Sequence, residues 1–336
     1  MKEAITHKPD IQEASPRGDA YTADFTAVSA THPLHGAILR ALLYYDIWHF
    51  PLTFNELYAL MPAKVDSPAG FRRFLEEYGP GPLVGEKKGY YYIRATGEAV
   101  IPLRKRREKH ARFMWRMAKV STHVLKRCPF VRGVFVSGEL SKNATQRKSD
   151  VDFVIVSAPG RLWIARTLMI AFKKIFLLNS KKFFCVNYHV TGNHLTLGER
   201  DVYVATEVAH LKPLYNSSLF GEYLRANGWI TSFFPNFDPR FLPRIPCNDR
   251  GSRLQRLLEG ALSLLPLDRI DIRLQEWMRK VWVRRYPEMD PRVREEIFRS
   301  TRDESRAYVG NFQKRVLDLY AQKLSRSGLP LESDHD

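Results

Sequence analysis

Apolar positions recur at helical spacing in three short segments near the start of the chain. The first segment covers residues 38–47. The second follows Thr53 and Glu56, which have the spacing of a capping box. The third starts at Ser67, an N-cap residue followed by proline, and ends at Gly79. The pattern therefore predicts three short helices in close succession.

A β-hairpin is predicted directly after these helices. Apolar and aromatic residues at 83–84 and 90–93 flank a polar turn that contains glycine. Three helices and a hairpin are the element order of a winged-helix module, which we expect over residues 34–100. The third helix has balanced charges, which favours a structural or protein-contact role over reading of DNA; they belong to Arg72, Arg73, Glu76 and Glu77.

A basic connector helix is expected over residues 101–128, because apolar residues keep helical spacing from Leu103 to Leu125. One acid, Glu108, accompanies its many cations: Arg104, Lys105, Arg106, Arg107, Lys109, Arg112, Arg116 and Lys119. Such a helix can simply have one packed and one solvated face. It can also present a stripe to non-specific nucleic acid or to another anionic surface, which are the partners that we expect for it.

Two strands with acids between them are predicted in the middle of the chain. The apolar run 134–136 breaks into Ser137 and Gly138, a polar segment follows, and the next apolar run begins with Asp150 and Asp152. Residues i and i+2 of a strand point to the same side, so both carboxylates project from one face. Paired carboxylates suit Mg²⁺, which also takes phosphate oxygens, or Mn²⁺ in its place.

The full expectation is an α+β fold with a small mixed-sheet core over residues 129–235. Residues 1–33 are polar and are expected to form a disordered leader, whereas residues 236–336 are expected to form a helical C-terminal region. Three segments of that region have helical spacing: 254–265, 270–283 and 316–324.

Composition adds a compartment and a class of partner. The chain has 336 residues, is 44% apolar and carries a formal charge of +17, which favours an anionic partner. Its three cysteines are widely spaced and form no CxxC motif, so we predict a cytoplasmic protein. The N-terminus has no apolar signal segment, and charges interrupt the most apolar stretch, Leu162 to Leu178, so we expect no transmembrane segment.

The central motif resembles the nucleotidyltransferase superfamily typified by DNA polymerase β. That pattern has glycine after one strand, about a dozen variable residues, and Asp-x-Asp on the next strand, here Gly138, Asp150 and Asp152. The stretches Ser149–Val190 and Thr206–Tyr215 also resemble a bacterial group of uncharacterised nucleotidyltransferase-domain proteins. The likeness covers about residues 36–235.

This resemblance implies transfer of a nucleoside monophosphate from a nucleoside triphosphate (NTP) to an acceptor that the sequence does not identify. It implies that Asp150 and Asp152 hold Mg²⁺ and that Asn187 lies at the position of a third catalytic residue. The expected nucleotide contacts are Ser137, Gly138, Ser141, Lys142 and Arg166.

Two departures from the superfamily pattern leave an alternative open. Glu139 stands where a serine is usual, and Asn187 stands where a third carboxylate is usual. Asparagine accepts no proton usefully, so His189 or Glu207, the latter expected at a helix start, would have to supply the base or the missing carboxylate. The alternative is an inactive nucleotide-binding protein coupled to a winged-helix interaction or DNA-binding module.

Overall fold

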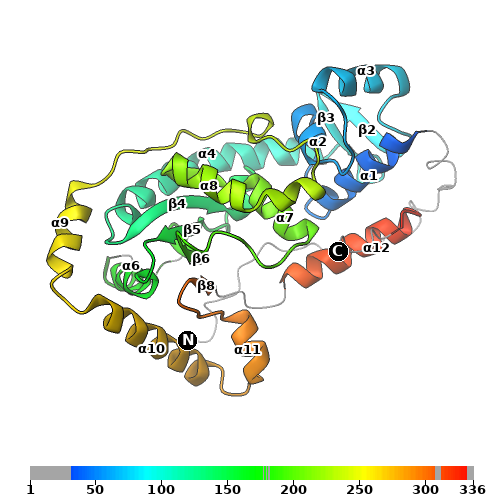
Figure 1. Ribbon diagram of the computed structural model, residues 1–336. Helices are drawn as coiled ribbons and strands as arrows, with labels where there is room; N and C mark the ends of the chain where they lie inside the picture. Colours follow the sequence, from blue (N-terminus) through cyan, green and yellow to red (C-terminus); the bar gives the residue numbers. More distant parts are fainter. Residues whose placement is uncertain (1–31, 177, 179, 181, 307–311, 331–336) are drawn as a thin grey trace.

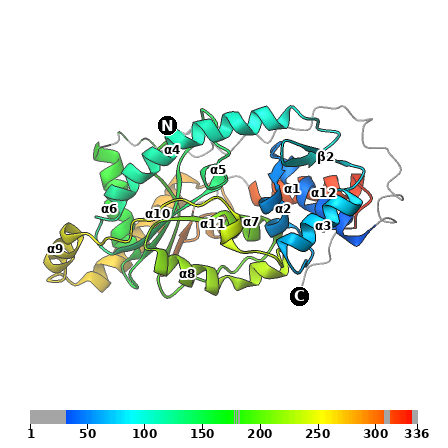
Figure 2. The same cartoon turned by 90° about the horizontal axis from the view of Figure 1, so that it is seen from above.

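Helices and strands are mixed along the chain, in agreement with the predicted α+β class, and the strands of the described residues form two sheets. The computed structural model describes residues 32–176, 178, 180, 182–306 and 312–330. The smaller sheet has the order β1-β3-β2 and the larger sheet the order β7-β4-β5-β6-β8. Figures 1 and 2 show the small sheet at one end of the molecule and the large sheet in its middle.

The N-terminal part has the predicted three helices and hairpin. Its elements are α1 (Pro33–Asp46), β1 (Leu52–Thr53), α2 (Phe54–Leu60), α3 (Pro68–Tyr78), β2 (Val84–Lys87) and β3 (Tyr90–Ile93). The capping box of Thr53 and Glu56 is present, and Ser67 caps α3. Gly79 ends α3 with φ +69°, a conformation that favours glycine. Residues 1–31 of the predicted leader lie outside the described residues.

The central part surrounds the large sheet. The long helix α4 (Val100–Leu125) leads into β4 (Val131–Ser137), α5 (Gly138–Ser141), β5 (Asp152–Ser157), α6 (Leu162–Phe176), β6 (Cys185–Thr191), α7 (Val202–His210), β7 (Lys212–Tyr215), α8 (Ser217–Ala226) and η2 (Gly228–Ser232). Strand β4 pairs antiparallel with both β5 and β7, whereas β5 and β6 run parallel. The ends of β4 and β5 that carry Ser137 and Asp152 therefore lie side by side.

The C-terminal part is not purely helical, which corrects the prediction for residues 236–336. It contains η3 (Pro239–Phe241), α9 (Arg253–Leu262), α10 (Leu267–Arg285), α11 (Pro291–Ile297), β8 (Glu304–Arg306) and α12 (Phe312–Arg326). Strand β8 joins the large sheet antiparallel to β6, with Arg306 opposite Tyr188. Its three polar residues form no apolar run, so the hydrophobic pattern gave no strand signal there.

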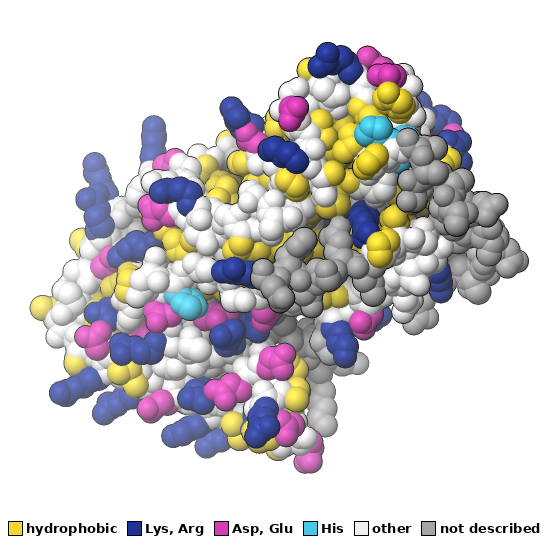
Figure 3. Space-filling view, turned by 45° about the vertical axis from the view of Figure 1, so that its right-hand side comes forward, with side chains coloured by type: hydrophobic (Ala, Val, Ile, Leu, Met, Phe, Trp, Pro, Cys, Tyr) yellow, Lys and Arg dark blue, Asp and Glu magenta, His cyan; other side chains and the backbone are white. Residues whose placement is uncertain are grey.

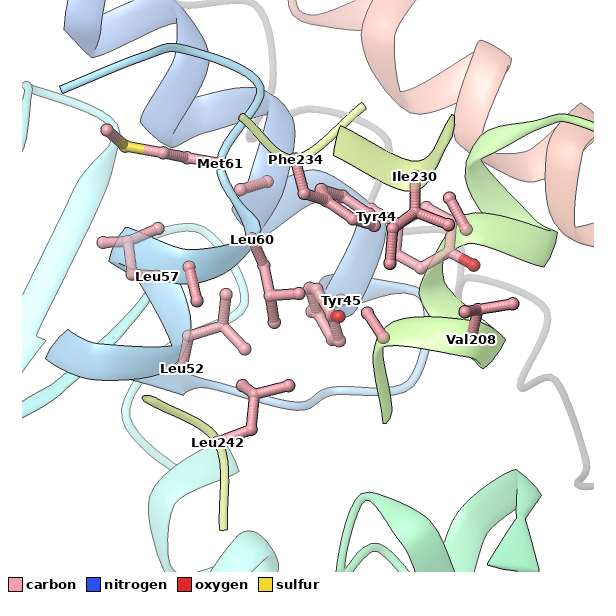
Figure 4. Close-up of a cluster of buried hydrophobic side chains, with 14 of the residues drawn as sticks. Tyr44, Tyr45, Leu52, Leu57, Leu60, Met61, Val208, Ile230, Phe234 and Leu242 are labelled. Carbon is pink, nitrogen blue, oxygen red and sulfur yellow. The ribbon is translucent and has the colours of Figure 1, made fainter. Parts of the chain in front are cut away.

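One apolar core joins the N-terminal helices to the helices around the large sheet. Figure 4 shows part of it, with Tyr44 and Tyr45 of α1 lying between Leu60 of α2 and Val208 of α7. The same cluster includes residues of α12, which packs against α1. The N-terminal part therefore packs directly against the part that contains the large sheet, in one shared core.

Candidate functional site

Gly138 forms the sharp turn between β4 and α5, and the turn requires a glycine for two reasons. Its φ is +69°, in the left-handed region that residues with a Cβ rarely adopt. A Cβ at this position would also lie 2.5 Å from Asp152 Oδ2. The backbone of the turn therefore lies directly against a carboxylate of the Asp-x-Asp motif.

The two acids of that motif flank Val151 at the start of β5. Strand β5 begins at Asp152, but the N–H of Val151 already donates to the Lys182 carbonyl at 2.9 Å. Val151 is fully buried, while Asp150 and Asp152 on either side of it are half-buried. Only Asp152 of the two lines the large cavity described below.

Asn187 contacts Asp152 across the parallel pair of strands. Its Nδ2 donates to Asp152 Oδ1, and its own Oδ1 lies 3.0 Å from Cys185 Sγ. The register of β5 and β6 shifts at this point, because Phe153 pairs with Val186 and Val154 pairs with Tyr188. Asn187 is thus the extra residue of a bulge, which re-aims its side chain toward the site.

Glu207 forms a hydrogen bond with the backbone of the glycine turn. Its Oε2 accepts a hydrogen bond from the Gly138 N–H at 3.2 Å, and its Oε1 forms an ion pair with Lys142 Nζ at 2.6 Å. The residue lies within α7, whose N-cap is Asp201, so the expectation that it starts a helix was wrong. Its single sequence signal was its place as the lone acid among the residues of that helix.

Glu139 faces the loop between α5 and β5. Its carboxylate accepts a hydrogen bond from Ser149 Oγ, and Ser149 Oγ in turn accepts one from the Gln146 N–H at 2.6 Å. Burial raises the pKa of Glu139, although the Ser149 hydrogen bond and the Arg107 charge oppose that rise. The unusual acid after the glycine therefore braces the segment that leads to Asp150.

Three residues that the sequence offered for the site lie away from the cavity wall. The Oγ of Ser141 is turned inward and donates to the Gly138 carbonyl at 2.8 Å. Arg166 is buried in α6, and burial lowers its pKa to about 10. His189 is fully buried with no hydrogen-bond partner for either ring nitrogen among the described residues. None of the three is placed to touch a ligand in the cavity.

A cavity of about 330 Å³ joins these groups to the other parts of the molecule. Ser137, Gly138, Lys142, Asp152, Asn187 and Glu207 form its polar wall. Trp48 after α1, Arg107 of α4, and Arg299, Arg306 and Phe312 of the C-terminal part also line it. Among the described residues, no group of three or more histidine, cysteine, aspartate or glutamate side chains could by itself hold a metal ion.

The basic residues of α4 divide between the interior and the surface. Arg104 is buried in an ion pair with Glu56, and Arg107 lines the cavity and donates to the Trp48 carbonyl at 2.7 Å, so neither belongs to a solvent-facing stripe. Five exposed cations follow one helical face: Lys105, Lys109, Arg112, Arg116 and Lys119. Arg106 is exposed as well, but it directly follows Lys105 and so lies beside this face. By contrast, on the face of the molecule in Figure 3, lysine and arginine are interspersed with acids.

Comparisons with known proteins give no relative for this chain. No protein-family model, no curated protein and no solved structure matches it. In the part of the chain that the structure describes, every helix is too short or too polar to cross a membrane.

Proposed function

We propose that the chain is a Mg²⁺-dependent nucleotidyltransferase that moves a nucleoside monophosphate from an NTP to an acceptor. The observation that supports it best is the close approach of the Gly138 turn to Asp152, since both residues line the cavity. A Cβ on Gly138 would lie only 2.5 Å from Asp152 Oδ2. A glycine turn against a carboxylate brings backbone N–H groups and an anionic cation-binding group to the same place. NTP binding needs both.

The side chains present suit magnesium when nucleotide is bound with it. Asp150 and Asp152, on either side of the buried Val151, offer two carboxylates, and Mg²⁺ is commonly held by one or two carboxylates together with substrate phosphates and water. The ion would neutralise the charge that develops on the transferred phosphate. The chain's own contribution is to orient the phosphates, with the Gly138 N–H and Lys142 as donors at the turn.

The three residues considered for proton removal from the acceptor are each engaged or buried. Asn187 donates to Asp152 and cannot act as a base, and His189 is sealed in the interior. Glu207 is engaged by Lys142 and Gly138. These observations favour the second candidate, a nucleotide-binding protein without transfer activity, in which the N-terminal part serves as the interaction module.

The N-terminal part fits a winged-helix-like module in its order of helices and strands. The four charged side chains of its third helix, α3, are all exposed and balance one another: Arg72, Arg73, Glu76 and Glu77. A surface with no net charge gives little attraction to phosphate, so we propose a protein-contact role for this helix. Incubation with labelled NTPs and a bacterial lysate would show which acceptor, if any, becomes labelled.

Calorimetry with a non-hydrolysable NTP analogue tests the nucleotide site directly. We expect binding in the presence of Mg²⁺ and a loss of at least about tenfold in affinity for the Asp150→Asn/Asp152→Asn variant, because both carboxylate charges are removed. Asp290→Asn, at the exposed N-cap of α11, serves as a control that changes charge far from the site. Equal affinity of the wild type and the double variant would show that Asp150 and Asp152 do not bind the nucleotide.

A second prediction concerns Glu207. Its carboxylate accepts from the two donors that phosphate would use, the Gly138 N–H and Lys142 Nζ. Glu207→Gln removes the negative charge and should weaken its hold on both donors. We expect metal-free tripolyphosphate to bind about three- to tenfold more tightly to this variant in calorimetry.

Glu199→Gln is the matched control for this experiment. Glu199 also lines the cavity, but its ion-pair partner is Arg306 rather than Lys142. If both variants bind tripolyphosphate more tightly by the same factor, the loss of any negative charge in the cavity explains the gain. The contact of Glu207 with Gly138 then has no specific effect on phosphate binding.

A further inference from the structure

Helix α9 is attached to the rest of the protein through polar side chains. Gln255 Nε2 donates to the carbonyls of Cys128 and Val131, at 2.9 Å and 2.6 Å. Glu259 accepts from the Phe130 N–H at 2.6 Å and forms an ion pair with Arg132 at 2.8 Å. Together with the partly buried Leu262, these residues are spaced four and three positions apart and define the attached side of the helix.

The other three leucines of the helix face solvent. Leu254, Leu257 and Leu258 recur at helical spacing, and Leu264 and Leu265 follow in the turn after the helix. Their exposed fractions lie between 37% and 88%. A water-facing helix normally shows the reverse arrangement, with leucines packed inward and polar groups outward. Clustered exposed apolar side chains of this kind mark an interaction surface.

The charges beside the leucines indicate what kind of surface covers them. Arg250, Arg253 and Arg256 are all exposed, and the acid of the helix, Glu259, is already paired with Arg132. A second copy of this chain would bring the same arginines together, on molecules that each carry +17. An anionic layer with an apolar interior satisfies both the arginines and the leucines.

We infer that α9 is an interfacial helix that rests on an anionic lipid bilayer. The leucines enter the boundary between headgroups and acyl chains, and the arginines contact the lipid phosphates. The helix lies at one end of the molecule in both Figure 1 and Figure 2, far from α3, so a flat surface can approach it. This inference does not depend on the proposed nucleotide site.

Vesicle co-sedimentation of the full chain tests the inference. We expect binding to vesicles that contain phosphatidylglycerol and weak binding to vesicles of phosphatidylcholine alone. Leu257→Ser/Leu264→Ser should lower the affinity for the anionic vesicles at least about tenfold, since each leucine loses its apolar burial. Arg253→Gln/Arg256→Gln should also weaken binding to the anionic vesicles. Added salt should reduce the vesicle binding of this variant less than it reduces that of the wild type.

Val120→Ser/Ile175→Ser is the matched control, because both residues are exposed aliphatic side chains on other helices, α4 and α6. It should bind vesicles as the wild type does. Two results would overturn the inference. One is vesicle binding that the leucine variant retains in full, or that the wild type lacks. The other is concentration-dependent dimerisation in light scattering that the leucine variant abolishes, which would assign the surface to a second copy.

Discussion

Replacement of Arg104 by methionine is expected to lower the free energy of unfolding by about 3–5 kcal/mol. Arg104 donates to both carboxylate oxygens of Glu56 at 2.8 Å, and both side chains are almost completely buried. Methionine would fill most of the space but leave the Glu56 carboxylate without its cation. An unpaired buried charge is costly because water cannot solvate it.

The pair also fixes α4 to the N-terminal part. Glu56 belongs to the capping box of α2 and accepts hydrogen bonds from the N–H and Oγ1 of Thr53. Arg104 donates to Glu108 as well, and its guanidinium lies 4.3 Å from the centre of the Phe50 ring. Urea denaturation followed by circular dichroism would measure the loss. Lys87→Met is the control, because the Lys87–Glu98 pair is exposed and we expect its removal to leave the denaturation midpoint unchanged.

The pH dependence of this loss has a defined sign. Burial acts to raise the pKa of Glu56, but Arg104 and the hydrogen bonds from Thr53 outweigh burial and hold the pKa below 4.5. The stability that the pair contributes is therefore present above pH 4.5 and is lost as pH falls through the folded-state value. The difference between wild type and Arg104→Met should narrow in acid. If the difference in free energy of unfolding between wild type and Arg104→Met stays constant from pH 7 to acid, lost packing and not the unpaired carboxylate causes the destabilisation.

Replacement of Gly138 by alanine is expected to abolish most Mg²⁺-dependent nucleotide binding, with a loss of at least about tenfold in affinity. The new Cβ would meet Asp152 Oδ2 at 2.5 Å, so either the carboxylate or the turn must move. Either movement separates the backbone donor of the turn from the acid that it lies against. The positive φ adds strain of about 1–2 kcal/mol, which should appear in the unfolding free energy.

Gly89→Ala separates these two effects. Gly89 has a similar φ of +75° in the turn between β2 and β3, but an added Cβ there meets nothing within 4 Å. This control should lose a similar amount of stability and keep its nucleotide affinity. If Gly138→Ala binds the NTP analogue as tightly as Gly89→Ala does, the contact between the turn and Asp152 has no part in nucleotide binding.

Local sequence was sufficient wherever neighbouring residues alone decide the structure. The capping box at Thr53, the N-cap at Ser67 and the C-terminal Gly79 were predicted and are present, because each depends on backbone groups within a few residues. The shared side predicted for Asp150 and Asp152 rests on the alternation of an extended chain, but β5 begins only at Asp152. Whether these acids bind nucleotide stays a prediction.

Tertiary structure decided every feature that depends on distant segments. Glu207 reaches Gly138 from 69 positions along the chain, and Arg104, which looks like one more surface cation, meets Glu56 from 48 positions away. Strand β8 has no apolar run and forms because β6 offers an edge. The exposed leucines of α9 also depend on distant segments. Their periodicity predicts a helix, but it does not predict which side of the helix packs against the rest of the protein. Periodicity reports local geometry, whereas burial and ion pairing depend on which segments meet when the chain folds.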